Sequence, residues 1–241
     1  AAVVAWRLWR WNPVLVIVAF SAFLIVDLAL FGATLLKVPE GGWFPLVIAA
    51  AVYLLMTTWR RGRAILADRL YADALPMDLF LQRVSPQSPQ RVAGTAVFMT
   101  GNPDVVPHAL LHNIKHNKVL HERVVVLTVI IDEVPRVSPE KAMHVEKLGK
   151  GFFRVVLHYG YLEQPHIPRA LELCRRYGLH LDMMETSFFL GRETLIPSKV
   201  AGLPSWREPA FILLSKTALS ATEFFCIPPG RVVELGTQVE I

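Results

Sequence analysis

The amino-acid sequence predicts an α-helical transmembrane hairpin followed by a cytoplasmic α/β domain. Its hydrophobic content of 53% and its mean hydropathy of +0.40 are high for a soluble protein. The excess lies in the first part of the chain, where two long apolar runs are flanked on their outer sides by arginines. From residue 91 onward, β-branched runs alternate with helical segments, which is typical of an α/β fold.

Residues 1–64 form the predicted transmembrane part, with two spans at about residues 14–36 and 43–59. The first span carries the single charge of Asp27, and it is long enough because about 20 apolar residues cross a hydrocarbon core of about 30 Å. The second span has no charge and carries tryptophan at both ends, as expected at the two membrane interfaces. A signal peptide is excluded because the first run is too long and a second span follows it.

Arginines on the outer flanks set the predicted orientation. They are Arg7 and Arg10 before the first span, and Arg60, Arg61, Arg63 and Arg69 after the second. The turn KVPEGG between the spans carries one lysine and one glutamate, so its charges cancel. The positive-inside rule therefore places both outer ends in the cytoplasm and the turn outside. Because the opening residues AAVVAW resemble the end of an earlier span, we expect the C-terminal part of a larger membrane protein.

Asp27 is the one charge inside a predicted span, and two interpretations of it stay open. Ionisable side chains within spans are costly and almost always face a protein interior or water, which suits a carboxylate that couples proton or cation movement. The alternative is a structural carboxylate, either hydrogen-bonded to a neighbouring helix or kept protonated by desolvation.

Residues 65–90 are predicted to connect the membrane part to an α/β domain of residues 91–241. The connector begins as an amphipathic helix that Pro76 interrupts. It continues into the linker SPQSPQ, whose two prolines block both helix and sheet.

The α/β domain is predicted from a series of short segments. Residues 123–133 are β-branched and continuously apolar, as in a central strand buried on both faces. Residues 139–148 are expected to form a short helix or an irregular segment. Further strands are expected at 94–100, at 152–163 and within 180–196, with a strand pair or strand-turn at 228–241; helices are expected at 105–120, 167–177 and 206–225, the second of them ended by Gly178.

TGNPD follows the first predicted strand and precedes a predicted helix. Its simplest role is to start that helix, with Asn102 or Asp104 as the N-cap. A second interpretation is an anion site, because free N–H groups at a helix start bind phosphate. Lys115, Lys118 and Arg123 would then offer cations to a nucleotide, at the strand ends where α/β sheets bind ligands.

The stretch LHNIKHNKVLHE extends a row of histidines that starts upstream at His108. His108, His112 and His116 line one helical face, the spacing that can present a zinc pair. Two lysines on the same helix oppose a cation, and no acid or thiolate lies near enough in sequence to complete a zinc shell. Three interpretations remain, in rising order of preference: a zinc site, a basic anion-binding surface and a structural helix.

No catalytic set emerges, so an enzyme is disfavoured. Ser187, His158 and Asp182 could be drawn as a triad, but no GxSxG elbow frames the serine. Cys174 has the spacing of a core-facing helix residue. Cys174 and Cys226 support neither a disulfide framework nor a thiolate metal site, and they suit a reducing cytosol.

Several blocks resemble one family closely. HNIKHNKVLHERVVVLTV, METSFFLGRE and RVVELGTQVEI are similar to the C-terminal half of bacterial Kup-type potassium uptake permeases, the KUP/HAK/KT family. WNPVLV, VDLALFGATLLKVPEGGWFPL and MTTWRRGR resemble the last two transmembrane helices of that family. The resemblance covers essentially the whole chain.

This resemblance implies a K+:H+ symporter of the cell inner membrane, multi-pass, with a cytoplasmic C-terminal domain. The hairpin would be the last two helices of a LeuT-like core and would pack on N-terminal helices missing from this chain. No cofactor is implied beyond the transported K+ and H+, and the main ion site would lie in the missing part. Relatives also imply a homodimer and a cyclic dinucleotide or ATP as a regulatory ligand, and no nucleic-acid partner is expected.

Overall fold

The computed structural model describes residues 1–7, 9–72, 74–85, 89–196 and 202–240. The chain divides into two compact units, residues 1–58 and residues 59–241. Each unit is described here by itself.

The first unit is built from helices, with a short non-helical connection before α2. It contains α1 (Ala2–Arg7), α2 (Pro13–Leu35), a π-helical turn (Val38–Gly42) and the first half of α3 (Trp43–Tyr71). Asn12 caps α2 by accepting a hydrogen bond from the N–H of Val14 at 3.0 Å, and Pro13 occupies the first helical position, where its missing N–H costs nothing. Two helical segments, Pro13–Leu35 and Val38–Tyr71, are long and apolar enough to cross a membrane, in agreement with the two predicted spans.

Helix α3, at 29 residues, is longer than the second predicted span. The helix continues through the arginines that follow Trp59 and ends at Tyr71. This continuation is the predicted connector helix, and it belongs to the second unit. Pro76 then separates α3 from the short helix α4 (Met77–Arg83), as the sequence indicates. Residues 86–88 of the predicted SPQSPQ linker lie outside the described residues.

The second unit is built on one six-stranded sheet with the order β3-β4-β2-β1-β5-β6. Its strands are β1 (Gln90–Met99), β2 (Val119–Asp132), β3 (Met143–Gly149), β4 (Phe152–Gly160), β5 (Thr186–Ile196) and β6 (Val232–Glu240). All neighbouring strands run parallel except β3, which pairs antiparallel with β4 at one edge. The prediction of a central buried strand at 123–133 is confirmed by β2, which lies between β4 and β1.

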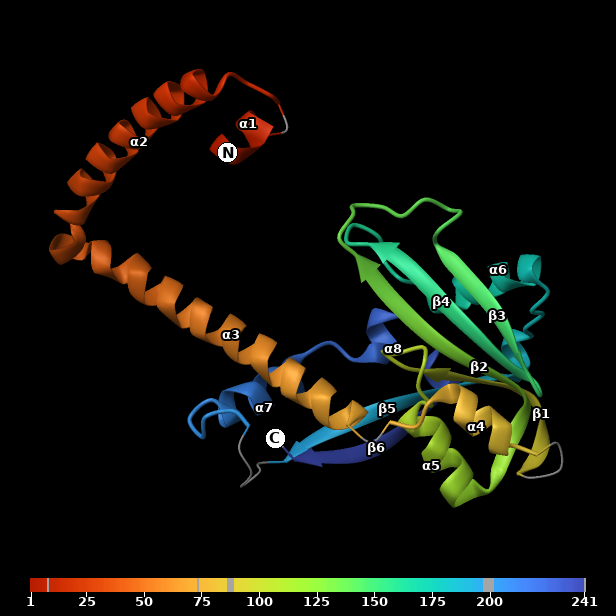
Figure 1. Cartoon of the computed structure of the whole chain (residues 1–241). Helices are drawn as coiled ribbons and strands as arrows, with labels where there is room; N and C mark the ends of the chain where they lie inside the picture. Colours follow the sequence, from red (N-terminus) through yellow and green to blue (C-terminus); the bar gives the residue numbers. More distant parts are fainter. Residues whose placement is uncertain (8, 73, 86–88, 197–201, 241) are drawn as a thin grey trace. The chain divides into compact units, whose positions relative to one another are not determined.

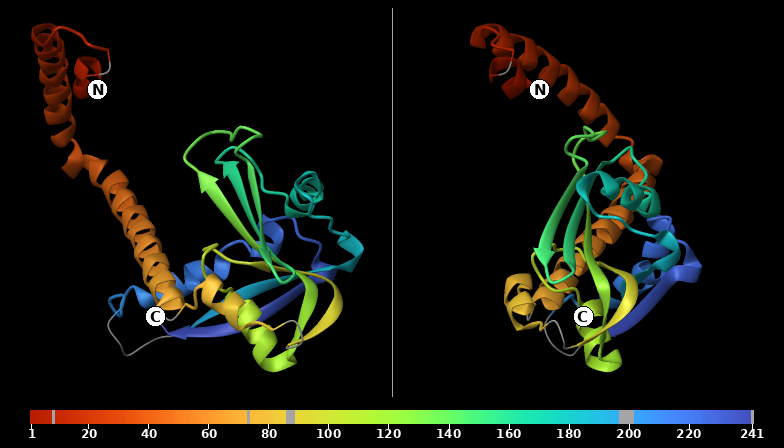
Figure 2. Two further views of the ribbon diagram at one scale, coloured as in Figure 1. Left: turned by 45° about the vertical axis from the view of Figure 1, so that its right-hand side comes forward. Right: turned by 90° about the vertical axis from the view of Figure 1, so that its right-hand side faces the viewer.

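Helices cover both faces of the sheet, with α4 and α5 on one side and α6 on the other (Figures 1 and 2). The helices are α5 (His108–Asn117), α6 (Ile167–Leu173) extended by a 3-10 turn (Cys174–Tyr177), α7 (Glu208–Thr217) and α8 (Ala221–Phe224), with further 3-10 turns at Met183–Glu185 and Pro229–Arg231. Gly178 ends the α6 segment in the left-handed region at φ 78°, as expected of a glycine after a helix.

Three apolar clusters form the core of the second unit. On one face Phe98 of β1 stacks on Phe189 of β5 with ring centroids 4.6 Å apart, and α4 and α5 cover them. On the other face Val97 and Leu127 pack under α6. A third cluster joins α3 and α7 to the ends of β5 and β6, with Phe211 of α7 fully buried.

Two predicted elements differ from the structure. Residues 139–148 were expected to be helical or irregular, but Met143–Gly149 form the edge strand β3. Its apolar Met143 and Val145 pack on the α6 face, and His144 and Glu146 alternate with them. This alternation with a period of two is typical of a strand, and pairing with β4 completes its backbone hydrogen bonds on one side.

The predicted helix near the C-terminus is divided into two shorter helices. The predicted helix at 206–225 is interrupted between α7 and α8, because Ala218 is extended and Ser220 begins α8 as its N-cap. Of the two alternatives predicted at 228–241, the structure shows the strand-turn: the 3-10 turn Pro229–Arg231 leads into the single strand β6, which pairs in parallel with β5.

Among the five parallel strands, β1 is the strand from which the sheet is extended first to one side and then to the other. From β1 the chain adds β2 and β4 on one side, then crosses over to add β5 and β6 on the other. The strand order therefore reverses between β1 and β5, and open α/β sheets bind ligands outside the carboxyl ends of strands at such a reversal. The loop after β1 lies at this position.

Phe98 provides a test of the core. We expect Phe98→Ala to lower the free energy of unfolding by about 3–5 kcal/mol, because a fully buried ring stacked on Phe189 is lost and a cavity remains. Denaturant unfolding of the chain in detergent, followed by circular dichroism, measures the change. The control is Leu162→Ala, at a side chain that is 68% exposed, where we expect a change below about 0.5 kcal/mol. Equal effects of the two substitutions would contradict the packing described.

Candidate functional site

The loop after β1 carries two of the residues singled out from the sequence, Asn102 and Asp104. The hydroxyl of Thr100 accepts a hydrogen bond from the N–H of Asn102 at 3.3 Å, and the Asn102 side-chain oxygen accepts one from the N–H of Asp104 at 3.0 Å. The helix itself begins further on, at His108, with Pro107 at the cap position. Asn102 and Asp104 therefore shape the loop, and neither is the N-cap of α5.

Arg154 of β4 holds this loop against the sheet. Its Nε donates to the carbonyl of Pro103 at 3.0 Å, and its Nη2 lies 3.8 Å from the carboxylate of Asp104. Its Nη1 also forms an ion pair with Glu146 of β3 at 2.8 Å. The Arg154 side chain is only 17% exposed, so these charge-assisted contacts are partly shielded from water.

The same loop is bonded to the connector that leads from the membrane part. The N–H of Met77 donates to the carbonyl of Asp104, and the N–H of Val106 donates to the carbonyl of Leu75, both at 2.9 Å. At the start of α5, Nε2 of His108 lies 2.7 Å from the carbonyl of Leu70, near the end of α3. The strand-end loop, α5 and the end of α3 are thus joined by hydrogen bonds.

The cations predicted to complete an anion site lie elsewhere. Lys115 and Lys118 are at the far end of α5, and Arg123 lies in the first half of β2. The ten residues of α5 extend about 15 Å away from the loop after β1. Arg123 donates to the carbonyl of His180 at 2.8 Å. The structure therefore does not bring Lys115, Lys118 and Arg123 together with the loop after β1.

The histidine row lies on α5 as the spacing predicts. His112 and His116 have ring centroids 5.7 Å apart, while His108 is bonded to the carbonyl of Leu70. Within the described parts of the chain, no three metal-ligating side chains form a group. This row therefore offers two neighbouring imidazoles and a structural contact to α3.

A polar pair at the carboxyl ends of β2 and β4 is not indicated by any sequence motif. Nδ1 of His158 lies 3.1 Å from the carboxylate of Asp132. Nearby, the Glu163 carboxylate accepts hydrogen bonds from the N–H groups of Gly160 at 2.7 Å and Val137 at 3.1 Å, which hold the pKa of that carboxyl below its usual range. The pair depends on a contact between strands, so sequence distance could not reveal it.

The triad drawn from the sequence is not assembled. Ser187 is in β5, and Asp182 caps the 3-10 turn before that strand by accepting from the N–H of Met184 at 2.8 Å. His158 pairs with Asp132 instead. These three side chains therefore supply no nucleophile with its base.

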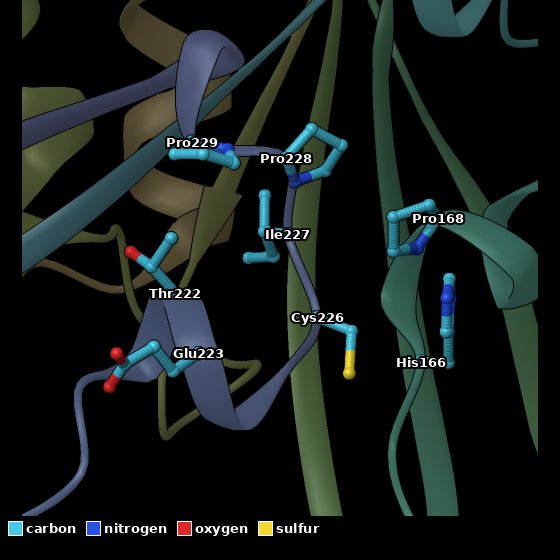
Figure 3. A pocket seen from close by; sticks show the side chains of 8 residues that line it. All are labelled: His166, Pro168, Thr222, Glu223, Cys226, Ile227, Pro228 and Pro229. Carbon is cyan, nitrogen blue, oxygen red and sulfur yellow. The ribbon is translucent and has the colours of Figure 1, made fainter.

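A pocket of about 600 Å³ lies between the start of α6 and the segment after α8 (Figure 3). Figure 3 shows Cys226 and His166 among its lining side chains. His166 caps α6, since its Nδ1 accepts a hydrogen bond from the N–H of Arg169 at 3.3 Å. The second cysteine, Cys174, is buried under the sheet, and burial raises the pKa of its thiol to about 11. Cys174 is therefore a core residue, as its spacing predicts.

Asp27 lies in the second half of α2, within the apolar segment. Among the described residues it has no hydrogen-bond or ion-pair partner. The structure thus places this carboxylate in a membrane span without defining its partner, and both interpretations of it stay open.

Comparisons with known proteins cover both parts of the chain. The model of the K+ potassium transporter integral membrane domain matches residues 1–64, and that of the K+ potassium transporter C-terminal domain matches residues 93–241. "Probable potassium transport system protein Kup 1" of Paramagnetospirillum magneticum is 55% identical over 242 residues, which cover 100% of this chain and 38% of that relative. A "Probable potassium transport system protein Kup" of Azoarcus sp. is 54% identical over 241 residues, which cover 100% of this chain and 38% of that relative. No solved structure matches the chain.

A pair of apolar helices continued by a six-stranded α/β domain defines an integral membrane protein that carries a folded domain outside the bilayer. The chain belongs to the K+ potassium transporter family, and the resemblance seen in the sequence is thereby confirmed. It spans 38% of the length of the two relatives named above.

Arg154 allows the loop contacts to be tested. We expect Arg154→Ala to destabilise the second unit by about 1–3 kcal/mol and to speed amide hydrogen exchange in the loop after β1, because a partly buried guanidinium that bonds Pro103 and Glu146 is removed. The matched control is Arg192→Ala, which removes an ion pair to Glu234 from an arginine that is 75% exposed and should cost at most about 1 kcal/mol. Unchanged exchange at Asp104 and Val106 would contradict the role given to Arg154.

Proposed function

We propose that the chain is the C-terminal portion of a secondary potassium transporter that brings K+ into the cell together with H+. The match of both family models along the chain supports potassium transport as the activity of the whole protein. The relatives are named as potassium transport system proteins and are about half identical to this chain over its full length. The transported ions would be bound mainly by helices that precede this chain.

The proposed setting is the cell inner membrane, with the α/β domain in the cytoplasm. The arginines after Trp59 support this orientation, because basic residues concentrate on the cytoplasmic side of a span. In the proposal α2 and α3 are the last two helices of a LeuT-like core and pack on N-terminal helices of the same transporter. A homodimer is part of the proposal by analogy with related transporters.

Asp27 is the one residue of this chain that we propose for the transport step. A carboxylate within an apolar span is retained at a cost, and proton-coupled carriers use such groups as relays. If Asp27 takes up and releases the co-transported proton, its removal changes how uptake depends on pH. If Asp27 has only a structural role, its removal changes the amount of folded protein instead.

The decisive experiment is the rescue of growth at low potassium by the full-length parent in cells that lack their own potassium uptake. We expect rescue by the parent, and slower uptake with a weakened pH dependence for Asp27→Asn at equal protein in the membrane. Absence of rescue by the parent would contradict potassium transport. Rescue with unchanged uptake and unchanged pH dependence in Asp27→Asn would remove that residue from the coupling step.

A second candidate function is specific to the α/β domain: a regulatory module that binds a nucleotide. The loop after β1 lies where the strand order reverses, and it is bonded through Met77 and Val106 to the connector from the membrane part. A ligand at this loop would therefore act on groups that are attached to α3. Lys115 and Lys118 lie at the other end of α5, and Arg123 lies in the first half of β2. A bound nucleotide would therefore contact either the loop after β1 or these cations.

Calorimetry tests the regulatory proposal and also locates the ligand. The 241-residue chain in detergent is titrated with cyclic di-AMP and with ATP, since Met77 and Phe80 of α4 belong to the core and a shorter fragment would expose it. A loop site predicts that Asn102→Ala weakens binding and that Lys115→Gln/Lys118→Gln leaves it unchanged, while a site on the cations predicts the reverse. No heat at millimolar ligand would end the regulatory proposal.

A membrane-anchored enzyme is the third and disfavoured candidate. The described residues show no nucleophile with a base and an orienting group, since Ser187, His158 and Asp182 lie apart. The relatives are also named as transport proteins. We therefore propose no catalysed reaction.

A further inference from the structure

The cytoplasmic half of α3 starts with the residues of a membrane interface. Trp59 closes the apolar stretch, and Arg60, Arg61 and Arg63 follow it on the same helix. Tryptophan and arginine in this order mark the passage from the hydrocarbon core into the headgroup layer. That layer is about 5–8 Å thick on each side, since a core of about 30 Å lies in a bilayer of about 40–45 Å.

Helix α7 packs on α3 directly after the apolar stretch. Phe211 of α7 is fully buried, and its ring centroid lies 5.7 Å from that of Trp59. Its ring also fills the space beside Gly62, where a Cβ atom would approach it to 2.3 Å. Gly62 lies three residues beyond Trp59, which is about 4.5 Å along the helix axis. The contact therefore joins α7 to the turn of α3 that carries the interfacial residues Trp59 and Arg63.

The outward face of α7 has the composition of a helix that lies in this layer. Leu213 is 63% exposed and lies one turn after the exposed Pro209, and Trp206 just before the helix is 64% exposed. Lys216 follows on the same side and is also exposed. Aromatic and aliphatic side chains with a flanking cation suit an interfacial helix, because the apolar groups enter the acyl boundary and the ammonium group reaches phosphates.

A pocket of about 640 Å³ opens beside α7, with α3, α8 and the second half of β5 as its other walls. Its lining carries three cations, Arg63, Arg192 and Lys216, and two acids, Glu193 and Glu234. Arg192 is paired with Glu234 at 3.1 Å. Within the described parts of the chain, Arg63 and Lys216 form no ion pair, and Arg63 lies over the ring of Trp59.

We propose that this pocket binds the headgroup of an anionic phospholipid from the leaflet into which Trp59 emerges, with Trp206 and Leu213 lying in the same layer. Arg63 and Lys216 contact the lipid phosphate, and Trp59 lies beside its glycerol region. The occupant is a lipid because the cations lie at headgroup depth next to exposed apolar side chains, a combination that a free anion does not need. The proposal depends on membrane insertion of α3 and not on which ion the whole protein carries.

Native mass spectrometry of the 241-residue chain tests the site, with phosphatidylglycerol and phosphatidylcholine added in mild detergent. We expect phosphatidylglycerol to be retained in preference, and the double variant Arg63→Gln/Lys216→Gln to weaken its retention roughly thirtyfold, since each interfacial cation contributes a factor of about five. Both side chains are exposed, so circular dichroism should show unchanged thermal unfolding.

The matched control is Lys115→Gln/Lys118→Gln, which removes the same charge at the far end of α5 and should leave retention unchanged. An equal loss in both double variants would overturn the proposal, because binding would then follow net charge alone. Displacement of the lipid by millimolar inorganic phosphate would also overturn it, since the site would then serve a free anion.

A depth measurement tests the proposal without removing any cation. A spin label is attached to Leu213→Cys, with Cys174→Ser and Cys226→Ser, in the full-length parent reconstituted with phosphatidylglycerol and phosphatidylcholine. We expect the accessibility of the label to oxygen and to a water-soluble nickel reagent to correspond to the depth of the headgroup layer. A label that both reagents fail to reach would show that α7 packs on another part of the transporter, and a label at the level of bulk water would exclude the interface; either result overturns the proposal.

Discussion

The mostly parallel sheet of the second unit has to be covered on both faces, and the packing of that unit depends on this requirement. Phe98 and Phe189 face one side and Val97 and Phe188 face the other, so each face needs an apolar layer of its own. On the first face that layer includes α4, whose Met77 is fully buried. Because α4 follows α3 within a few residues, the same packing holds the last residues of α3 near the loop after β1, within the second unit.

Polar contacts join the same elements. Arg154 bonds the loop after β1 from the side of β4, while Met77 and Val106 join this loop to the connector. His108 links the start of α5 to the end of α3. Hydrogen bonds therefore connect the loop after β1 to the end of α3.

The packing of Phe211 on Gly62 joins α7 to the part of α3 that belongs to the second unit. The absence of a Cβ at Gly62 lets the ring of Phe211 lie directly on α3, close to Trp59. Arg63, one of the arginines that follow Trp59, lines the pocket beside α7.

The sequence by itself determined the features that depend on local composition: the two apolar helices, the connector ended by Pro76, the central strand at 123–133 and the family. Only the tertiary structure decided that residues 143–149 form an edge strand, that Asn102 and Lys115 lie at opposite ends of α5, and that His158 pairs with Asp132. Hydropathy and helix signals are carried by neighbouring residues, so they can be read along the chain. Strand pairing, the direction of a crossover helix and the contact of Phe211 with Gly62 join residues far apart in sequence, and these contacts form only when the sheet buries both of its faces.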